Sequence, residues 1–392
     1  MVDDRISVAM LHGPGRPDRD GVSDYVAHLV AALADVGVAV SPVPVGGDGT
    51  SGGWRAATGR AAAEVRRLRP DLVHVQFAPA AYRFSGQPGL LPLRLPRGVP
   101  LVTTVHEYGW WAAPRWLPGP VWSAVERLRL WDRETGRLVP ASAAVIVTNA
   151  GHAAAVRART GRSPQHVPLA PNVAEPQGAA TAGWRLRAEL SLPEGAPLLV
   201  FFGFVHPVKG VRYLIEALPE LRRSYPDLRL LVVGGFTSQA LPEPEARAFR
   251  AELSGLAVRC GVADAVTFTG HVPAERVSAA LRAADAVVLP FTAGVDTKSG
   301  ALLAALAHGV PTAVTVPDSG DDEPHRQGAV AVIPARRDSA AIVRTVGGVL
   351  ADPVLRRRLA ERGRTFAAAY SWPGVAAAHR DLYARTLGRH GG

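Results

Sequence analysis

The sequence alternates short apolar runs with segments long enough to form helices, and it does so in two series. The first series of apolar runs lies at 6–11, 38–45, 72–77, 100–105 and 143–148. The second lies at 198–202, 228–233, 266–269, 286–290 and 312–316. Strands that alternate with helices are typical of parallel, doubly wound sheets. The pattern therefore predicts an α/β protein with two Rossmann-like domains.

A stretch rich in Pro, Gly, Ala and Glu separates the two series, and we interpret 174–197 as a linker. The predicted N-terminal domain spans 1–173, and the C-terminal domain spans 198–373. The break at 371–373 is expected to let a last helix, 374–392, cross back and complete the first domain. Ligands of open parallel sheets bind beyond the carboxyl ends of the strands, so we expect the two domains to face an interdomain cleft.

Composition narrows the classes of protein to which the chain can belong. Its 392 residues suit two domains, and the single cysteine, Cys260, excludes an internal disulfide and a cysteine-rich metal site. We find no credible metal-binding motif, no secretory signal and no apolar run long enough for a membrane span. We therefore expect a cytoplasmic protein, and contact with the inner membrane face stays open.

The basic residues are almost all arginine. The formal charge is +10, and two of the 44 basic residues are lysines, Lys209 and Lys298. The arginines are spread along the chain, which is not typical of a nucleic-acid-binding face. A basic balance suits an anionic small substrate or an anionic membrane surface.

Each lysine lies in a glycine-bearing segment that follows a predicted strand. In the segment FGFVHPVKG, residues 202–210, the strand ends at Gly203 and a helix is expected to begin at Lys209. Main-chain N–H groups at a helix start, together with an ammonium group, favour a diphosphate. The alternative is a surface lysine at a helix N-cap. Because lysine is so rare in this chain, we favour diphosphate binding.

The second lysine lies in GVDTKSG, residues 294–300, which leads into another predicted helix. Asp296 is expected to accept hydrogen bonds from sugar hydroxyls, while Lys298 and the helix start hold phosphate. The predicted donor contacts in this segment are Asp296, Thr297, Lys298, Ser299 and Gly300. A plain Asp/Ser capping arrangement is the alternative.

These two segments resemble glycosyltransferase family 4, whose members are retaining, nucleotide-sugar-dependent enzymes of the GT-B fold. The resemblance covers nearly the whole chain. It implies that Gly203 and Lys209 bind the donor pyrophosphate. The family's usual Arg after the first glycine is Phe204 here, and His206 is expected to substitute in part. Of the family's paired glutamates, the first aligns with Asp296 and the second with Ala304.

Three weaker matches extend the resemblance. Gly21 is similar to the glycine of a first loop that approaches the donor phosphate. His106 ends a predicted strand and is similar to a histidine beside the donor's anomeric carbon, although a structural role is the alternative. Val272 matches the segment whose main chain reads the nucleobase.

Five of the eight tryptophans fall within 110–131: Trp110, Trp111, Trp116, Trp122 and Trp131. We predict that Trp110 and Trp111 bind the acceptor, because aromatic faces stack on rings and pack at membrane surfaces. An ordinary aromatic core is the alternative.

The predicted function is that of a retaining, metal-independent hexosyltransferase. The sugar moves from a nucleoside-diphosphate donor, a UDP- or GDP-sugar, to a hydroxyl of a small molecule, glycan or lipid-linked acceptor. His106, Lys209 and Asp296 are the predicted catalytic residues. Two alternatives stay open: a catalytically weak sugar-nucleotide-binding partner, and a sugar-nucleotide 2-epimerase of the same fold.

Overall fold

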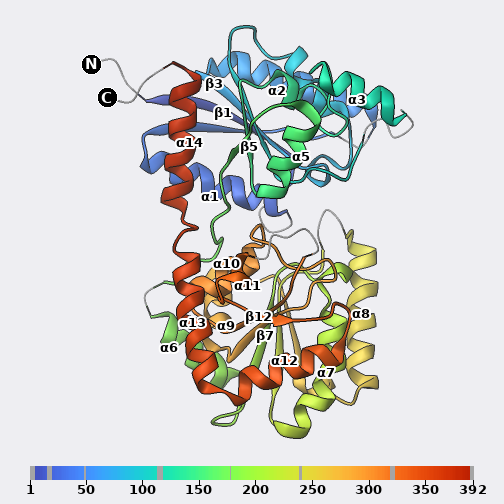
Figure 1. The fold of residues 1–392 in the computed structure, drawn as a ribbon, viewed down its shortest axis with the longest axis vertical. Helices are drawn as coiled ribbons and strands as arrows, with labels where there is room; N and C mark the ends of the chain where they lie inside the picture. Colours follow the sequence, from blue (N-terminus) through green and yellow to red (C-terminus); the bar gives the residue numbers. More distant parts are fainter. Residues whose placement is uncertain are drawn as a thin grey trace. The chain divides into compact units, whose positions relative to one another are not determined.

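The computed structural model describes residues 5–15, 20–47, 50–112, 118–176, 178–237, 241–317 and 323–388. The chain forms two compact units (Figure 1). The first unit comprises Met1–Leu169 and Trp372–Gly392, and the second comprises Ala170–Ser371. Each unit contains one six-stranded sheet in which every pair of neighbouring strands is parallel. The predicted α/β fold with two doubly wound parallel sheets is confirmed.

The sheet of the first unit has the strand order β2-β1-β3-β4-β5-β6. Its strands are β1 (Ile6–His12), β2 (Val38–Pro44), β3 (Leu72–Phe77), β4 (Leu101–Val105), β5 (Ala144–Val147) and β6 (Gln165–His166). Its helices are α1 (Gly21–Asp35), α2 (Ser51–Leu68), α3 (Gly119–Arg127), α4 (Leu138–Ala141), α5 (Ala150–Thr160) and α14 (Trp372–Thr386), with the 3₁₀ turns η1 (Ala80–Tyr82) and η2 (Gln87–Leu93). The strands predicted from the apolar runs therefore lie within about one residue of the observed ones.

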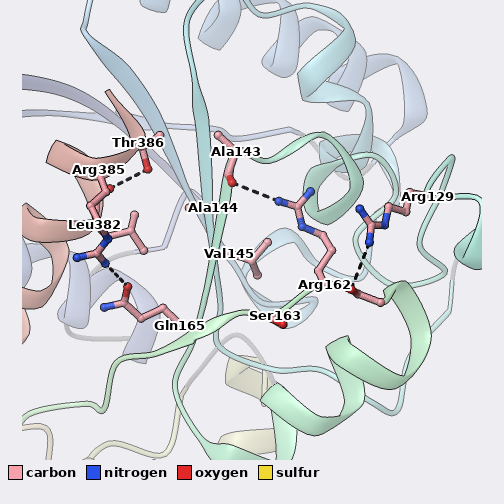
Figure 2. Close-up of a pocket in the computed structure, with 11 residues that line it drawn as sticks. Arg129, Ala143, Ala144, Val145, Arg162, Ser163, Gln165, Leu382, Arg385 and Thr386 are labelled. Carbon is pink, nitrogen blue, oxygen red and sulfur yellow. Dashed lines mark hydrogen bonds between the residues drawn. The ribbon is translucent and has the colours of Figure 1, made fainter. Parts of the chain in front are cut away.

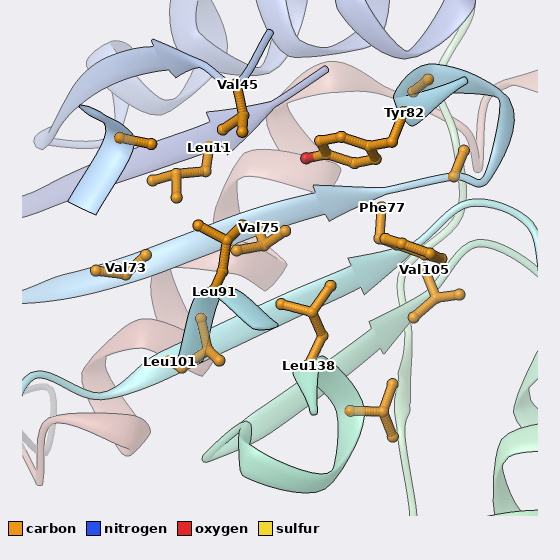
Figure 3. Close-up of a cluster of buried hydrophobic side chains, with 14 of the residues drawn as sticks. Leu11, Val45, Val73, Val75, Phe77, Tyr82, Leu91, Leu101, Val105 and Leu138 are labelled. Carbon is orange, nitrogen blue, oxygen red and sulfur yellow. The ribbon is translucent and has the colours of Figure 1, made fainter. Parts of the chain in front are cut away.

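The core of the first unit lies against one face of this sheet. Figure 3 shows side chains of β1, β3 and β4 meeting Tyr82, Leu91 and Leu138 from the segments that follow the strands. Every residue of β3 and β4 is buried. Burial of apolar surface on this scale provides the main stabilising free energy of such a unit.

The second unit has the strand order β12-β11-β10-β7-β8-β9. Its strands are β7 (Leu198–Phe202), β8 (Arg229–Val233), β9 (Val266–Gly270), β10 (Ala286–Leu289), β11 (Thr312–Thr315) and β12 (Ala331–Ile333). Its helices are α6 (Ala179–Glu189), α7 (Val211–Ser224), α8 (Glu243–Arg259), α9 (Ala274–Ala283), α10 (Gly300–Ala307), α11 (Glu323–Arg326), α12 (Ser339–Ala351) and α13 (Pro353–Ala367), with the 3₁₀ turns η3 (Pro207–Lys209) and η4 (Ala263–Ala265).

The stretch 174–197, which the sequence indicates as a linker, contains helix α6 and belongs to the second unit. Helix α6 packs against α9 so closely that a Cβ atom on Gly183 would lie 2.9 Å from the main chain of Arg282. The composition of this stretch hid the helix, because its apolar positions are mostly alanine and glycine. Helix α14, in turn, packs against α1 and belongs to the first unit.

Two kinds of feature are absent from the described residues. None of their helices has the length and hydropathy of a membrane span. No group of three or more His, Cys, Asp or Glu side chains in the described part of the chain has the arrangement of a metal site.

Candidate functional site

The second sheet reverses its strand order between β7 and β10. Chain connections leave these two neighbouring strands in opposite directions, so the loops that follow them diverge and leave a place where a ligand can bind. The loop after β7 carries Gly203, His206 and Lys209, and the loop after β10 carries 296–300. The fold therefore brings the two lysine-bearing segments to one edge of one sheet.

Lys209 is directed at the loop that follows β10. Its ammonium nitrogen lies 3.7 Å from the centre of the Phe291 ring, a cation–π contact. Burial lowers the pKa of Lys209 to about 8; the carboxylate of Asp296 opposes this shift, and the positive charge of Lys298 adds to it. The three charged groups are thus close enough to influence one another. An ammonium group held in such a place gains stability from an arriving anion.

Asp296 organises the loop after β10. Its Oδ1 accepts a hydrogen bond from the main-chain N–H of Lys298 at 3.2 Å, and its Oδ2 lies 3.3 Å from the Lys298 ammonium. Thr297 is buried beside them. Ser299 is the N-cap of α10, where its hydroxyl accepts from the N–H of Leu302 at 3.3 Å. The capping arrangement named as an alternative is therefore present, and it coexists with the cluster of charged groups.

The predicted helix start at Lys209 is wrong in detail. Residues 207–209 form the single turn η3, and α7 begins at Val211 after Gly210, which adopts φ +71°. His206 caps the turn: its Nδ1 accepts from the N–H of Val208 at 3.3 Å. The helix start next to the β10 loop belongs to α10 instead, and a Cβ atom on Gly203 would lie 3.7 Å from Ala301 in its first turn.

Close main-chain contacts hold these loops together. A Cβ atom on Gly210 would lie 2.0 Å from the carbonyl oxygen of Pro290, at the end of β10. A Cβ atom on Gly234 would lie 2.0 Å from the carbonyl oxygen of Gly203. Real Cβ atoms do not approach oxygen so closely, so both positions require glycine. The loops after β7, β8 and β10 are thereby locked against one another.

The remaining predicted positions of this unit lie near the same edge or inside the core. Val272 is half-buried and follows β9 at the carboxyl edge. Phe204 is half-buried in the loop after β7. Ala304 is fully buried in α10, so the position of the family's second glutamate carries no polar side chain here.

In the first unit, His106 follows β4 at the carboxyl edge of the sheet. Its Nε2 lies 2.8 Å from Oε1 of Gln76 on β3, and its ring contacts Tyr25 edge-to-face at 5.0 Å. A neutral imidazole that donates from Nε2 has an unprotonated Nδ1. Gln76 therefore fixes both the orientation and the tautomer of His106.

Gln76 belongs to a buried polar network that sequence reasoning missed. Its Nε2 lies 3.3 Å from Nε2 of His74, which also contacts the hydroxyl of Thr104 at 2.7 Å. Nδ1 of His74 lies 2.6 Å from the hydroxyl of Tyr383 on α14. Burial first, and then the neighbouring histidines His379 and His106, lower the pKa of His74. The available signal was the presence of two polar residues in the otherwise apolar run LVHVQF.

Gly21 is exposed at the first position of α1. A Cβ atom there would meet no atom within 4 Å, so packing does not require glycine. Asp20 caps the helix, and its carboxylate accepts from the N–H groups of Val22 and Ser23 at 3.3 and 3.1 Å. An anion at this helix start would therefore compete with Asp20.

The two predicted acceptor tryptophans differ in exposure. Trp110 is 59% exposed, and its ring contacts Phe84 edge-to-face at 5.9 Å. Trp111 is 5% exposed and is part of the hydrophobic core, which agrees with the alternative of an ordinary aromatic core at this position. Trp116 lies outside the described residues.

The chain is similar in sequence and in fold to known glycosyltransferases. Residues 183–366 match the family model described as glycosyl transferases group 1. The chain is 33% identical over 204 residues to D-inositol 3-phosphate glycosyltransferase of Nocardia farcinica, a match that covers 51% of this chain and 43% of that protein. It is 28% identical over 428 residues to D-inositol 3-phosphate glycosyltransferase 2 of Catenulispora acidiphila, covering 97% and 94%. The match to the Nocardia protein therefore spans less than half of that relative, whereas the match to the Catenulispora protein spans nearly all of it at lower identity.

A solved structure supports the fold. Anabaena Alr3699/HepE in complex with UDP-glucose superimposes with a TM-score of 0.70 at 14% identity, covering 98% of this chain and all of that one. At this identity the likeness concerns the fold, which agrees with the two parallel sheets described above. Residues 183–366 thus resemble the group 1 glycosyl transferases, and the two parallel sheets have the GT-B fold.

Proposed function

We propose that the chain is a retaining glycosyltransferase that moves a sugar from a nucleoside-diphosphate sugar to an acceptor hydroxyl. The observation that carries this proposal is the convergence of Lys209, Lys298 and Asp296 beside the start of α10. The two ammonium groups and the N–H groups of this helix start favour a diphosphate leaving group. Both of the chain's lysines lie here, although arginine serves at almost every other cationic position.

Each residue is assigned a separate task. Lys209 stabilises the negative charge that develops on the departing diphosphate, and Lys298 assists it. Asp296 accepts hydrogen bonds from hydroxyls of the donor sugar. His106, oriented by Gln76, borders the anomeric carbon. With these cations in place we propose that no divalent metal is needed, because they neutralise the diphosphate directly.

The comparisons favour particular substrates. Anabaena HepE was solved with UDP-glucose, which favours a UDP-sugar as the donor. The names of the curated relatives favour a phosphorylated polyol as the acceptor. A thermal-shift screen against UDP, GDP and ADP tests the donor base, and a transfer assay in excess EDTA tests metal independence. Loss of transfer in EDTA that Mg²⁺ restores would contradict a metal-free reaction.

Phe204 and Ala304 favour a second candidate, a sugar-nucleotide-binding partner with little catalytic activity. These residues stand where the family has an arginine and a glutamate, and the fully buried Ala304 offers nothing to a ribose. Donor hydrolysis without acceptor separates the two candidates. A transferase releases some nucleoside diphosphate under these conditions, whereas a binding protein leaves the donor intact.

Binding of a nucleoside diphosphate is expected to weaken as the pH rises above about 8, the pKa to which burial lowers Lys209. Below this pH the ammonium is already formed. Above it, binding requires uptake of a proton, so the Kd rises by up to about tenfold per pH unit. Calorimetric titrations of UDP between pH 6.5 and 9.5, in buffers of different ionisation enthalpy, measure both the affinity and the proton uptake.

The control for this pH dependence is Lys209→Arg. A guanidinium group stays protonated over the whole range, so the variant should bind UDP with little change in affinity between pH 7 and 9.5. An identical rise in Kd in both proteins would show that another group titrates.

Replacing Gln76 by leucine is expected to lower kcat by about 10- to 100-fold with little change in the KM for the donor. The change removes the acceptor for the Nε2–H of His106, so the ring loses its orientation and tautomer, as for partners of metal-bound histidines. Steady-state kinetics measure the split between kcat and KM, and ¹⁵N chemical shifts report the tautomer of His106.

Thr103→Val is the matched control for Gln76→Leu. Thr103 is also a buried polar residue of this sheet, but its hydroxyl bonds to Ser142 at 2.8 Å and does not reach His106. Its variant should lose stability without a change in the tautomer of His106. If the two substitutions lowered kcat equally, the role of Gln76 would be purely structural.

A further inference from the structure

A polar pocket of about 510 Å³ opens in the first unit, where strand β5 begins. Figure 2 shows its walls: the first residues of β5, the segment after α5, Gln165 of β6 and the last turn of α14. Three arginines line it. Arg129 and Arg162 come from one side of β5, and Arg385 comes from α14 on the other side.

The three guanidinium groups bond to neutral acceptors. Arg129 donates to the carbonyl oxygens of Thr160 and Gly161, both at 3.3 Å. Arg162 donates to the carbonyl oxygens of Pro140 and Ala143 at 3.2 and 3.3 Å. A guanidinium group has five N–H donors, so these contacts hold the side chains in place and leave further donors for a ligand.

Arg385 is held in place by a hydrogen bond to a side chain. It donates to the side-chain oxygen of Gln165 at 2.7 Å. Gln165 and Ser163 add uncharged polar groups to the same pocket. A ligand that carries hydroxyls next to its charge would find partners of both kinds here.

Among the residues that the structure describes, none of these three arginines forms a salt bridge with a carboxylate. The ion pairs nearest in sequence, Arg133 with Glu126 and Arg159 with Glu134, use other arginines. Burial, and then the positive charge of Arg129, lower the pKa of Arg162. The carbonyls at the end of α5 compensate the charge in part, but two adjacent cations in a hollow gain much more from an anion.

The pocket is distinct from the site around His106. The strands of this sheet are parallel, and Ala144, the first residue of β5, pairs with Val102 near the start of β4. His106 follows the other end of β4. The pocket therefore lies at the amino ends of the strands, and His106 lies at their carboxyl ends. A ligand in the pocket takes no part in the reaction at His106.

We propose that this pocket is a second anion site, and that it binds the phosphate group of a phosphorylated, hydroxyl-bearing compound. Arg129 and Arg162 contact the phosphate, and Arg385 and Gln165 contact the rest of the ligand. The phosphate group can come from a soluble metabolite or from a lipid headgroup, which present the same chemistry. The ligand would join α14 to β5 and α5 and so stabilise the first unit. The proposal stands independently of the proposed transfer reaction.

The test uses the full chain carrying Lys209→Ala, so that phosphate does not bind at the donor site. Glycerol 3-phosphate is titrated by calorimetry at constant ionic strength, with glycerol as the uncharged comparison. We expect saturable binding of glycerol 3-phosphate that Arg129→Gln together with Arg162→Gln weakens by at least about tenfold. Arg66→Gln is the matched control, because Arg66 also donates to a carbonyl, that of Arg94, but lies outside the pocket.

Arg385→Gln is a second variant that should fold normally, because the hydrogen bond that it removes goes to the side chain of Gln165 and not to the main chain. It too should weaken binding. Sedimentation with phosphatidylcholine vesicles, with and without phosphatidic acid, identifies the source of the phosphate. If the protein sediments with the vesicles only when they contain phosphatidic acid, and only when the arginines are present, the phosphate belongs to a lipid headgroup. If the protein binds glycerol 3-phosphate but not the vesicles, the ligand is a soluble metabolite. Absence of binding in both assays, or binding that is unchanged in the arginine variants, would overturn the proposal.

Discussion

Replacing Lys209 by alanine is expected to lower the rate of sugar transfer by about 10²- to 10³-fold, the usual cost of losing one preorganised group that stabilises developing charge. The ammonium lies against Phe291 and within the electrostatic reach of Asp296 and Lys298. Lys298 assists Lys209 but is not expected to replace it, because the Lys298 ammonium is also paired with Asp296. We therefore expect the largest functional effect of any single side chain in the second unit.

The measurement is the rate of UDP release with saturating acceptor, together with the Kd of UDP. Arg212→Ala is the matched control: it removes a cation three residues further on, which forms an ion pair with Glu252 on α8. That variant should keep the wild-type rate, and both variants should keep the wild-type circular dichroism spectrum. Unchanged transfer in Lys209→Ala would refute the assigned task of the lysine.

Replacing Gly210 by alanine is expected to lower the free energy of unfolding of the second unit by about 2–4 kcal/mol, near the upper end for single substitutions. Two effects add. The φ of +71° is strained for a residue with a Cβ atom, and that atom would lie 2.0 Å from the carbonyl oxygen of Pro290. The main chain must move, and the loops after β7 and β10 move with it. Affinity for UDP should fall with stability.

Gly195→Ala separates the two effects. Gly195 has a similar φ of +77°, but a Cβ atom there would meet nothing within 4 Å. We expect a loss of about 1 kcal/mol from backbone strain alone, with UDP affinity unchanged. Urea unfolding followed by far-UV circular dichroism gives both losses of unfolding free energy. Equal losses of unfolding free energy in the two variants would show that the contact with Pro290 does not contribute to the effect at Gly210.

The sequence was sufficient to predict five of the six strands in each sheet, because buried parallel strands are continuous apolar runs that need no partner to be recognised. The short strands β6 and β12 were not predicted. Lys209 and Lys298 stood out for a different reason: they are exceptions in a chain that otherwise uses arginine. Knowing that each follows a strand was enough to place both lysines at one edge of a sheet. The site in the second unit therefore followed from local patterns.

The features that sequence reasoning missed depend on distant contacts. His74 bonds to Tyr383, which is 309 residues away, and no local pattern reports such a pair. The burial of Trp111 depends on how the segments after the strands fold over the sheet. The turn at 207–209 replaces a helix start because Gly210 must pass close to Pro290. In each case a tertiary contact overrode a reasonable local expectation.

The membership of α14 in the first unit has a consequence for how the protein is made. Strand β3 needs the hydroxyl of Tyr383 as a partner for His74, yet Tyr383 leaves the ribosome after the entire second unit. The segment that is synthesised first must therefore wait, with His74 still lacking its partner, until the last residues of the chain emerge. Because nascent chains fold domain by domain from the N-terminus, the second unit is the one that can finish early, as an insertion within a partner that is still incomplete.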